Sequence, residues 1–202
     1  MTDTEMKYES RGTYEIAGKR ILDLCLAFLL AIPALLICLI CAVAIRYERN
    51  GSVLFKQIRI GRGQEKFTLF KLRTMAVETE HRPSHEISSA KVTRVGRFLR
   101  KTKLDELPQI INVIKGDMSF VGPRPCLPSQ TELIMQREKE GAYRVRPGIT
   151  GRGQVQGIDM SSPSELARID GDYASTMSLG GDLRLMALTL IGRGGGDAVG
   201  GN

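Results

Sequence analysis

The longest apolar stretch of the chain lies near its start, between residues 21 and 45. It reads ILDLCLAFLLAIPALLICLICAVAI and contains a single charged residue, Asp23. As a helix it would rise ~37 Å, enough to cross a hydrocarbon core of ~30 Å. It lacks the short apolar core and the small-residue cleavage site of a signal peptide. The pattern therefore predicts a membrane helix at 21–45, preceded by an N-terminal segment at 1–20.

Pro33 lies in the middle of this apolar run. Proline removes a helical hydrogen bond and disfavours helical geometry at the residue before it, here Ile32. Cations flank both ends of the run, so the positive-inside rule gives no orientation. Two alternatives follow: one spanning helix, or a re-entrant helix that breaks at Ile32–Pro33 and returns to the face it entered. The run alone favours neither.

Beyond residue 46 the pattern becomes polar, and apolar residues begin to alternate with polar ones. Residues 52–75 read SVLFKQIRIGRGQEKFTLFKLRTM, two runs typical of strands around the turn cluster GRGQE. This pattern predicts a short β-hairpin. Alternation places Lys71 and Arg73 on one face of the second strand, opposite Phe70 and Leu72. Two cations on one face are typical of a solvated strand and are also what a phosphate site needs.

Helical spacing of apolar residues returns after residue 94. It predicts a short basic helix that includes Arg100, then a second helix that begins near Asp105 and ends at Gly116. In one interpretation, Asp105 or Thr102 only caps this helix, and Glu106 favours its positive end. In the other, the helix start holds a phosphate beside a carboxylate nucleophile, and Asp105 shares a Mg²⁺ ion with the substrate. The stretch alone leaves both open.

Two arginines farther along the chain are set beside prolines. Arg124 lies between Pro123 and Pro125, and Arg146 precedes Pro147. A residue before proline is restricted to extended geometry, so both arginines are expected on stiff backbone. Several glycines follow closely and would allow a ligand to approach the backbone; they stand at 148, 151, 153 and 157. The concentration of these features predicts a phosphate-binding site without the common GxxxxGK[ST] loop.

Composition narrows the class of partner. The chain has 202 residues and a net charge of +7, so one domain with an anionic partner is expected. Aromatic residues make up 5% and Trp is absent, which argues against a nucleic-acid partner that stacks bases. Three of the four cysteines lie in the apolar run, where cysteine acts as a small hydrophobic residue.

Taken in order, five motifs resemble one known family. They are KRILDL before the apolar run, FKQIRIG, FKLRTM, RKTKLDELPQIINVIKGDMSFVGPRP and VRPGITGRGQVQG, and they extend over residues 16 to 160. The sequence is similar to the bacterial monotopic phosphoglycosyl transferases, which begin glycoconjugate assembly on a polyprenyl phosphate. The Asp-Glu pair alone would be a weak signal, whereas five motifs in the right order are specific.

The resemblance implies substrates and roles that composition does not give. A UDP-sugar and undecaprenyl phosphate would react with Mg²⁺ present, Asp105 attacking the sugar-bearing phosphorus and Glu106 assisting as a base. Phosphate charge would be neutralised by basic residues at matching positions, namely Lys71, Arg73, Arg100, Arg124 and Arg146. The resemblance also implies a re-entrant membrane helix and a catalytic domain on the cytoplasmic face of the bacterial inner membrane. Where many members have Ser before the proline, this chain has Ile32.

The expected fold is a small α/β catalytic domain, mostly helical, at 46–192, with a Gly-rich and disordered tail at 193–202. Sugar specificity is assigned to the loop at 76–91 and the region after Gly157, with no particular sugar indicated. The sequence leaves open whether the chain forms a homodimer. A competing hypothesis is a membrane-anchored basic protein without catalysis, which binds anionic lipid or nucleic acid. It accounts for the charge and the anchor but requires neither the Asp-Glu pair nor the proline-flanked arginines.

Overall fold

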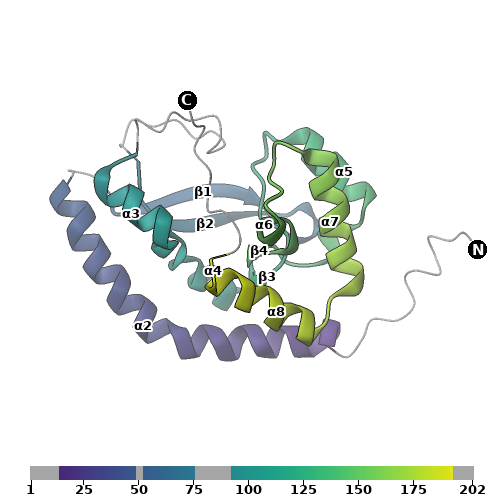
Figure 1. The fold of residues 1–202 in the computed structure, drawn as a ribbon, viewed down its shortest axis with the longest axis horizontal. Helices are drawn as coiled ribbons and strands as arrows, with labels where there is room; N and C mark the ends of the chain where they lie inside the picture. Colours follow the sequence, from purple (N-terminus) through teal and green to yellow (C-terminus); the bar gives the residue numbers. More distant parts are fainter. Residues whose placement is uncertain (1–13, 49–51, 76–91, 193–202) are drawn as a thin grey trace, which may run out of the picture.

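A computed structural model describes residues 14–48, 52–75 and 92–192 of the chain. The predicted loop at 76–91 and the predicted tail at 193–202 lie outside the described residues. The fold combines one long helix with a mostly helical domain and two small sheets, as Figure 1 shows. The mostly helical α/β class predicted from the sequence is therefore confirmed.

The long helix, α2, runs from Lys19 to Glu48 and follows a short π-helical turn, η1, at Tyr14–Gly18. At 1.5 Å per residue it is ~45 Å long. Among the described residues it is the one helix long and apolar enough to cross a membrane. It extends beyond both ends of the predicted 21–45 range.

The predicted break at Ile32–Pro33 is not found, because α2 remains helical through Pro33. The helix instead bends about midway along its length and curves around the domain (Figure 1). A proline in a helix removes one hydrogen bond and commonly produces a bend of this kind. Ile32 is 72% exposed on the outer side of the helix.

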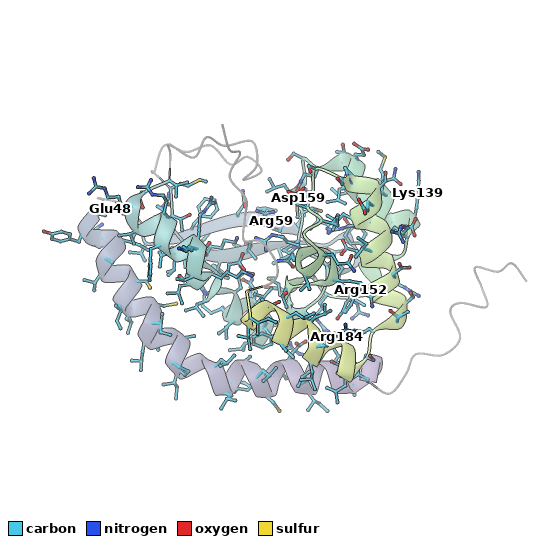
Figure 2. All side chains as sticks on the ribbon, viewed as in Figure 1. Glu48, Arg59, Lys139, Arg152, Asp159 and Arg184 are labelled. Carbon is cyan, nitrogen blue, oxygen red and sulfur yellow. The ribbon has the colours of Figure 1, made fainter. Side chains whose placement is uncertain are left out.

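The two faces of α2 differ in their surroundings. A narrow stripe is buried against the domain and contains small residues such as Ala27, Ala34 and Cys41. The outer face is apolar and exposed; its large residues are Ile21, Phe28, Leu29, Ile32, Leu35, Leu36, Leu39, Ile40 and Val43. In Figure 2 the side chains along this outer edge stand clear of the domain. Soluble proteins rarely expose an apolar face of this extent, which indicates contact with a bilayer.

The predicted hairpin is confirmed. Strand β1 (Leu54–Ile60) pairs antiparallel with β2 (Lys66–Leu72), with Leu54 opposite Leu72 and Ile60 opposite Lys66. The turn between them is the 3₁₀ segment η2 (Arg62–Gln64). Helix α3 (Arg94–Thr102), the 3₁₀ turn η5 (Leu104–Glu106) and helix α4 (Gln109–Lys115) follow beside it.

The second sheet was not predicted from the sequence. It pairs β3 (Ser119–Val121) with β4 (Gly148–Thr150) in parallel. Helix α5 (Thr131–Lys139) and the turn η6 (Ala142–Arg144) lie between these strands in the chain. Helices α6 (Arg152–Gln156), α7 (Pro163–Thr176) and α8 (Leu179–Leu190) complete the domain.

Both ends of α2 are attached to this one domain. At its start, Lys19 Nζ lies 2.7 Å from Asp182 Oδ2 of α8. At its end, the Glu48 carboxylate accepts hydrogen bonds from the backbone N–H groups of Arg94 and Val95, at 2.8 and 3.1 Å, at the start of α3. Between these points Ala27 and Ala34 join a core cluster with Leu69 of β2 and Val113 of α4. The domain therefore lies on the inner side of the bent helix.

Candidate active site

The acidic pair lies in a tight turn between two helices. Lys103 ends α3 in the left-handed conformation, with φ of 58°, and the chain then forms the 3₁₀ turn that carries Asp105 and Glu106. Both carboxylate residues are largely buried, with 5% and 7% exposed. Helix α4 begins only at Gln109, and its N-cap residue is Pro108, which has no capping side chain. Asp105 is therefore not the N-cap residue of this helix, and its role in the reaction remains a prediction.

Glu106 brings two of the predicted cations together. Lys71 Nζ lies 3.1 Å from Glu106 Oε1, and Arg124 Nη2 donates to the same oxygen at 2.9 Å. The three side chains come from β2, from η5 and from the loop after β3. Buried charges of opposite sign stabilise one another only when they are close and hydrogen-bonded, as here. The structure thus assembles an acidic and basic cluster from segments far apart in the sequence.

A buried asparagine connects the hairpin to the helix that follows the acidic turn. Asn112 Nδ2 donates to the carbonyl of Thr68 at 2.7 Å, and its Oδ1 accepts from the backbone N–H of Phe70 at 3.2 Å. These bonds join α4 to β2 on the residues just before Lys71. Asn112 therefore fixes the distance between the strand that carries Lys71 and the turn that carries Glu106.

Arg100 comes from the last turn of α3, directly before the acidic turn. Its Nε donates to Thr74 Oγ1 at 3.1 Å. Its Nη1 is buried and has no hydrogen-bond partner in the part of the chain that the structure describes. A buried guanidinium N–H without an acceptor is costly, and an oxygen of a bound phosphate would satisfy it.

Two predicted phosphate-binding residues lie elsewhere in the structure. Arg73 follows β2, donates to the carbonyl of Ser52 at 2.7 Å and lies over the Phe55 ring. Arg146 donates to the carbonyl of Gly116 at 2.8 Å, at the end of α4 opposite to the acidic turn. Burial, followed by repulsion from Arg20 and Arg62, lowers the pKa of the Arg146 guanidinium. Their roles toward phosphate remain predictions.

The predicted glycines serve internal packing. A Cβ on Gly148 or on Gly151 would collide with the backbone of Gly122, and one on Gly153 would collide with Leu166. Gly157 ends α6 with φ of 75°, a conformation that favours glycine. The close approach that these glycines permit is thus between protein segments, in contrast to the expected approach of a ligand.

A divalent cation is compatible with the acidic turn. Within residues 14–48, 52–75 and 92–192, no three His, Cys, Asp or Glu side chains gather as a metal cluster. Mg²⁺ requires no such cluster, because it commonly binds one or two carboxylates together with phosphate oxygens and water. Glu106 Oε1 accepts Lys71 and Arg124. The predicted role of Asp105 as a metal ligand remains a prediction.

A second buried network, not predicted from the sequence, surrounds Asp182 where α2 begins. Tyr14 and Tyr173 donate to its carboxylate at 2.6 and 2.9 Å, and Lys19 pairs with it. Burial, together with the Asp182 charge, raises the pKa of both tyrosines. Asp23 lies 3.9 Å from Lys19 Nζ and accepts hydrogen bonds from Ser119 and from the backbone of Phe120. The network fixes the start of α2 to β3 and α8.

A cavity of about 520 Å³ lies between α6, α7 and α8. Its polar lining includes Arg152 and Arg184, both labelled in Figure 2, and its apolar lining includes Val155 and Leu188. Arg152 donates to Thr176 and lies over the Tyr173 ring, so the domain itself holds this side chain. None of the predicted site residues lines this cavity.

With the fold and the acidic cluster described, comparison with known proteins identifies the family. The family model described as bacterial sugar transferase matches residues 14–193, which is most of the chain. The chain belongs to this family. It is an enzyme of the phosphoglycosyl transferase class, as the sequence motifs predicted.

Three curated relatives illustrate the similarity. The UDP-glucose:undecaprenyl-phosphate glucose-1-phosphate transferase of Caulobacter vibrioides is 40% identical over 184 residues, covering 85% of this chain and 68% of the relative. The sugar transferase EpsL of Bacillus subtilis is 36% identical and covers 85% of each chain. A UDP-N-acetylgalactosamine-undecaprenyl-phosphate N-acetylgalactosaminephosphotransferase of Aeromonas hydrophila is 38% identical over 85% of this chain and 42% of its own length. Two of these names specify different sugars on one acceptor.

Proposed function

We propose that the chain transfers a sugar 1-phosphate from a UDP-sugar to undecaprenyl phosphate and releases UMP. The observation that carries the proposal is the buried cluster in which Lys71 and Arg124 meet on Glu106 beside Asp105. A phosphoryl transfer site must hold several negative charges near a nucleophile, and positioned cations supply that stabilisation. The family membership and the names of the relatives agree with this reaction.

The proposed reaction has two steps. In the first, a carboxylate oxygen of Asp105 forms a bond to the sugar-bearing phosphorus, and the phosphoanhydride bond to UMP breaks. In the second, an oxygen of undecaprenyl phosphate attacks the same phosphorus, the bond to Asp105 breaks and the carboxylate is restored. Dividing one transfer into two displacements is the usual benefit of a covalent intermediate.

Glu106 has two roles in this proposal. It assists the second step as a base, and its carboxylate holds Lys71 Nζ and Arg124 Nη2 side by side when no phosphate is present. A phosphate group of the substrate can then accept hydrogen bonds from these two cations in place of Glu106. The cations are already arranged for an anion. Such preorganisation reduces the cost of ordering the site during the reaction.

Arg100 supplies a further donor. Its buried Nη1 group lacks an acceptor in the described residues, and a phosphate oxygen would complete its hydrogen bonding. Asp105 would hold the Mg²⁺ ion, which would supply additional neutralisation of phosphate charge. Arg73 and Arg146 are proposed to bind substrate phosphate from farther out, as their basic positions in the family motifs suggest.

We also propose that α2 is re-entrant and that the domain lies on the cytoplasmic face of the inner membrane. The support is the attachment of both helix ends to one domain, by Lys19 to Asp182 and by Glu48 to the start of α3. Ends on opposite faces of a bilayer would draw the polar backbone and charges of that domain into hydrocarbon, which is costly. A bent helix that inserts only its apolar outer face avoids this cost.

The direct test of function is a panel of UDP-sugars, incubated with detergent-solubilised protein, undecaprenyl phosphate and Mg²⁺ while UMP is measured. At least one sugar, with UDP-glucose and UDP-N-acetylgalactosamine as first choices, should give UMP and a lipid-linked product. A chelator should abolish the signal. No UMP from any sugar, together with binding of anionic lipid, would favour the non-catalytic alternative.

A further inference from the structure

The loop that carries Arg124 is hydrogen-bonded along its whole length. Each backbone carbonyl from residue 123 to residue 126 accepts one hydrogen bond of 2.9 Å, and each bond comes from a different residue. Gly148 N donates to the Pro123 carbonyl, and Arg137 Nη1 donates to the Arg124 carbonyl. Arg59 Nη1 donates to the Pro125 carbonyl, and Ile60 N donates to the Cys126 carbonyl. Two consecutive carbonyls are therefore held by guanidinium groups.

Arg137 reaches this loop from α5 and is 1% exposed. Its Nε and Nη2 donate to a single oxygen of Asp170 on α7, at 2.9 and 2.6 Å, which leaves Nη1 directed at the Arg124 carbonyl. Asp170 is 2% exposed. A fully buried guanidinium requires a counter-charge, and the planar shape of the group lets it hold Asp170 and the loop together.

Arg59 donates to the next carbonyl of the loop, that of Pro125. It lies on β1, and in Figure 2 its label stands between the hairpin and the side of the domain formed by α5 and α7. Its Nε and Nη2 donate to Gln57 Oε1 at 3.0 and 2.6 Å, and its Nη1 donates to the Pro125 carbonyl. Gln57 thus orients Arg59 in the way that Asp170 orients Arg137.

A contribution to stability alone does not account for the arginine at 137. Burying an ion pair costs desolvation that the attraction between its members barely offsets, and apolar replacements of such pairs are often neutral or stabilising. What the pair does provide here is a fixed direction for a backbone carbonyl. The Arg124 side chain on that backbone donates to Glu106 at 2.9 Å.

We propose that Arg137, oriented by Asp170, is a positioning residue for the transfer reaction, and that Arg59 supports it. The two guanidinium groups fix the backbone at Arg124 and Pro125. This backbone directs the Arg124 guanidinium group toward Glu106 and toward the substrate phosphate that would bind there. The inference rests on the proposed function of Arg124. It adds that the geometry of the site is set from α5 and α7, elements that carry none of the predicted catalytic residues.

The test is a double-mutant cycle on the rate of UMP release. Lysine at 137 can pair with Asp170 but cannot at the same time hold the Arg124 carbonyl as a planar fork does. We expect Arg137→Lys to lower kcat about tenfold or more in the wild-type background, with little change in KM. In an Arg124→Lys background the same change should lower kcat less than twofold, because the side chain it positions is already altered.

The control is Arg168→Lys on α7, where Arg168 forms an exposed pair with Asp172 at 3.7 Å; it should leave kcat unchanged. Thermal unfolding monitors folding of each variant.

Should Arg137→Lys not fold, Arg59→Lys and Asp170→Asn enter the same cycle, since each disturbs one support of the loop and leaves Arg137 in place. Equal losses in both backgrounds would overturn the proposal, since Arg137 would then act independently of Arg124.

A failure of the proposed transferase function would give a different result from a failure of the positioning role. If no UDP-sugar yields UMP with wild-type protein, the proposed function fails before the cycle begins, and the inference falls with it. If wild type is active and Arg124→Lys is as active as wild type, the positioning role is refuted while the transferase function stands.

Discussion

Lys71 and Arg124 direct their cationic groups at one oxygen of Glu106, at 3.1 and 2.9 Å, although one residue ends a hairpin and the other lies in a loop after β3. Lys71 is buried and Arg124 is half-buried, so both cations are partly shielded from solvent. In the proposed reaction, a carboxylate held in this way would organise two groups that bind phosphate before a substrate arrives. The proposed chemistry therefore requires the negative charge of Glu106.

Replacing Glu106 by Gln tests that dependence. The substitution removes the negative charge and leaves two cations close together, which we expect to cost about 3 kcal/mol of folding free energy. Overall turnover should fall strongly, while formation of the Asp105 adduct in a single turnover should fall less, because Glu106 is proposed to act mainly in the second step. The measurements are urea unfolding and UMP release with and without lipid.

Glu132→Gln is the control for this variant, because Glu132 is exposed in the first turn of α5. It should alter neither stability nor turnover. Full activity of Glu106→Gln would show that neither the base nor the charge pairing is required.

Arg124 and Arg146 are predicted to act on substrate phosphate, and Arg→Lys at each position tests this. Lysine retains the charge and loses the planar bidentate fork. We expect kcat/KM to fall more than tenfold, equivalent to ~1.4 kcal/mol, in each variant. A smaller loss of kcat/KM in Arg146→Lys alone would show that Arg146 has a structural role at the end of α4, where it donates to the Gly116 carbonyl.

Removal of the bend in α2 should change how the protein sits in the membrane. With cysteines introduced near residues 10 and 50 in a cysteine-free background, both ends should react from the cytoplasmic side only. Pro33→Leu should straighten the helix and carry one end across the bilayer in part of the population. Ile32→Leu, at an exposed apolar neighbour, should leave the labelling unchanged. Labelling of the wild-type ends from opposite sides would rule out re-entrance.

Alkaline pH should loosen the attachment of α2 to the domain. Burial, followed by the Asp182 charge, raises the pKa of Tyr173 above its ordinary value of 10.0, so the folded state keeps a proton that the unfolded state has lost. Stability from this group is complete below pH ~10 and decreases as the pH rises further.

Tyr173→Phe removes this titration along with hydrogen bonds to Asp182 and Val121. The variant should be about 1 kcal/mol less stable at pH 8, and the difference from wild type should shrink above pH 10. Tyr47→Phe, at a residue that is 95% exposed, should follow wild type throughout. A constant difference from pH 8 to pH 11, measured by urea unfolding, would contradict the assignment.

Sequence patterns predicted the parts of this fold that depend on local spacing. Alternation identified the hairpin, and apolar spacing identified α3 and α4. The family resemblance named Glu106, Lys71 and Arg124, which the structure brings together. The bend replaced the predicted break at Pro33 because α2 is held against the domain along its inner face, which the apolar run alone does not indicate.

Other parts depend on pairing between distant segments. Strands β3 and β4 have three residues each, too few to show alternation, and they pair across α5. Arg137 and Asp170 are charged residues in ordinary helices and resemble solvated positions in the sequence. Only the packing of α5 against α7 reveals that they are buried partners, and no local signal would have identified them.

Asp105 is proposed to form a covalent bond to the phosphosugar, and this step can be tested directly. Asp105→Asn is nearly isosteric, so the fold should survive while turnover falls by several orders of magnitude; Asp172→Asn, on the surface of α7, should remain active. The most direct measurement is intact-protein mass spectrometry after mixing wild type with the active UDP-sugar and Mg²⁺, without lipid. We expect the mass to increase by one phosphosugar. This increase should disappear on addition of undecaprenyl phosphate and should be absent in Asp105→Asn. An unmodified wild-type mass under these conditions, or an active Asp105→Asn variant, would contradict it.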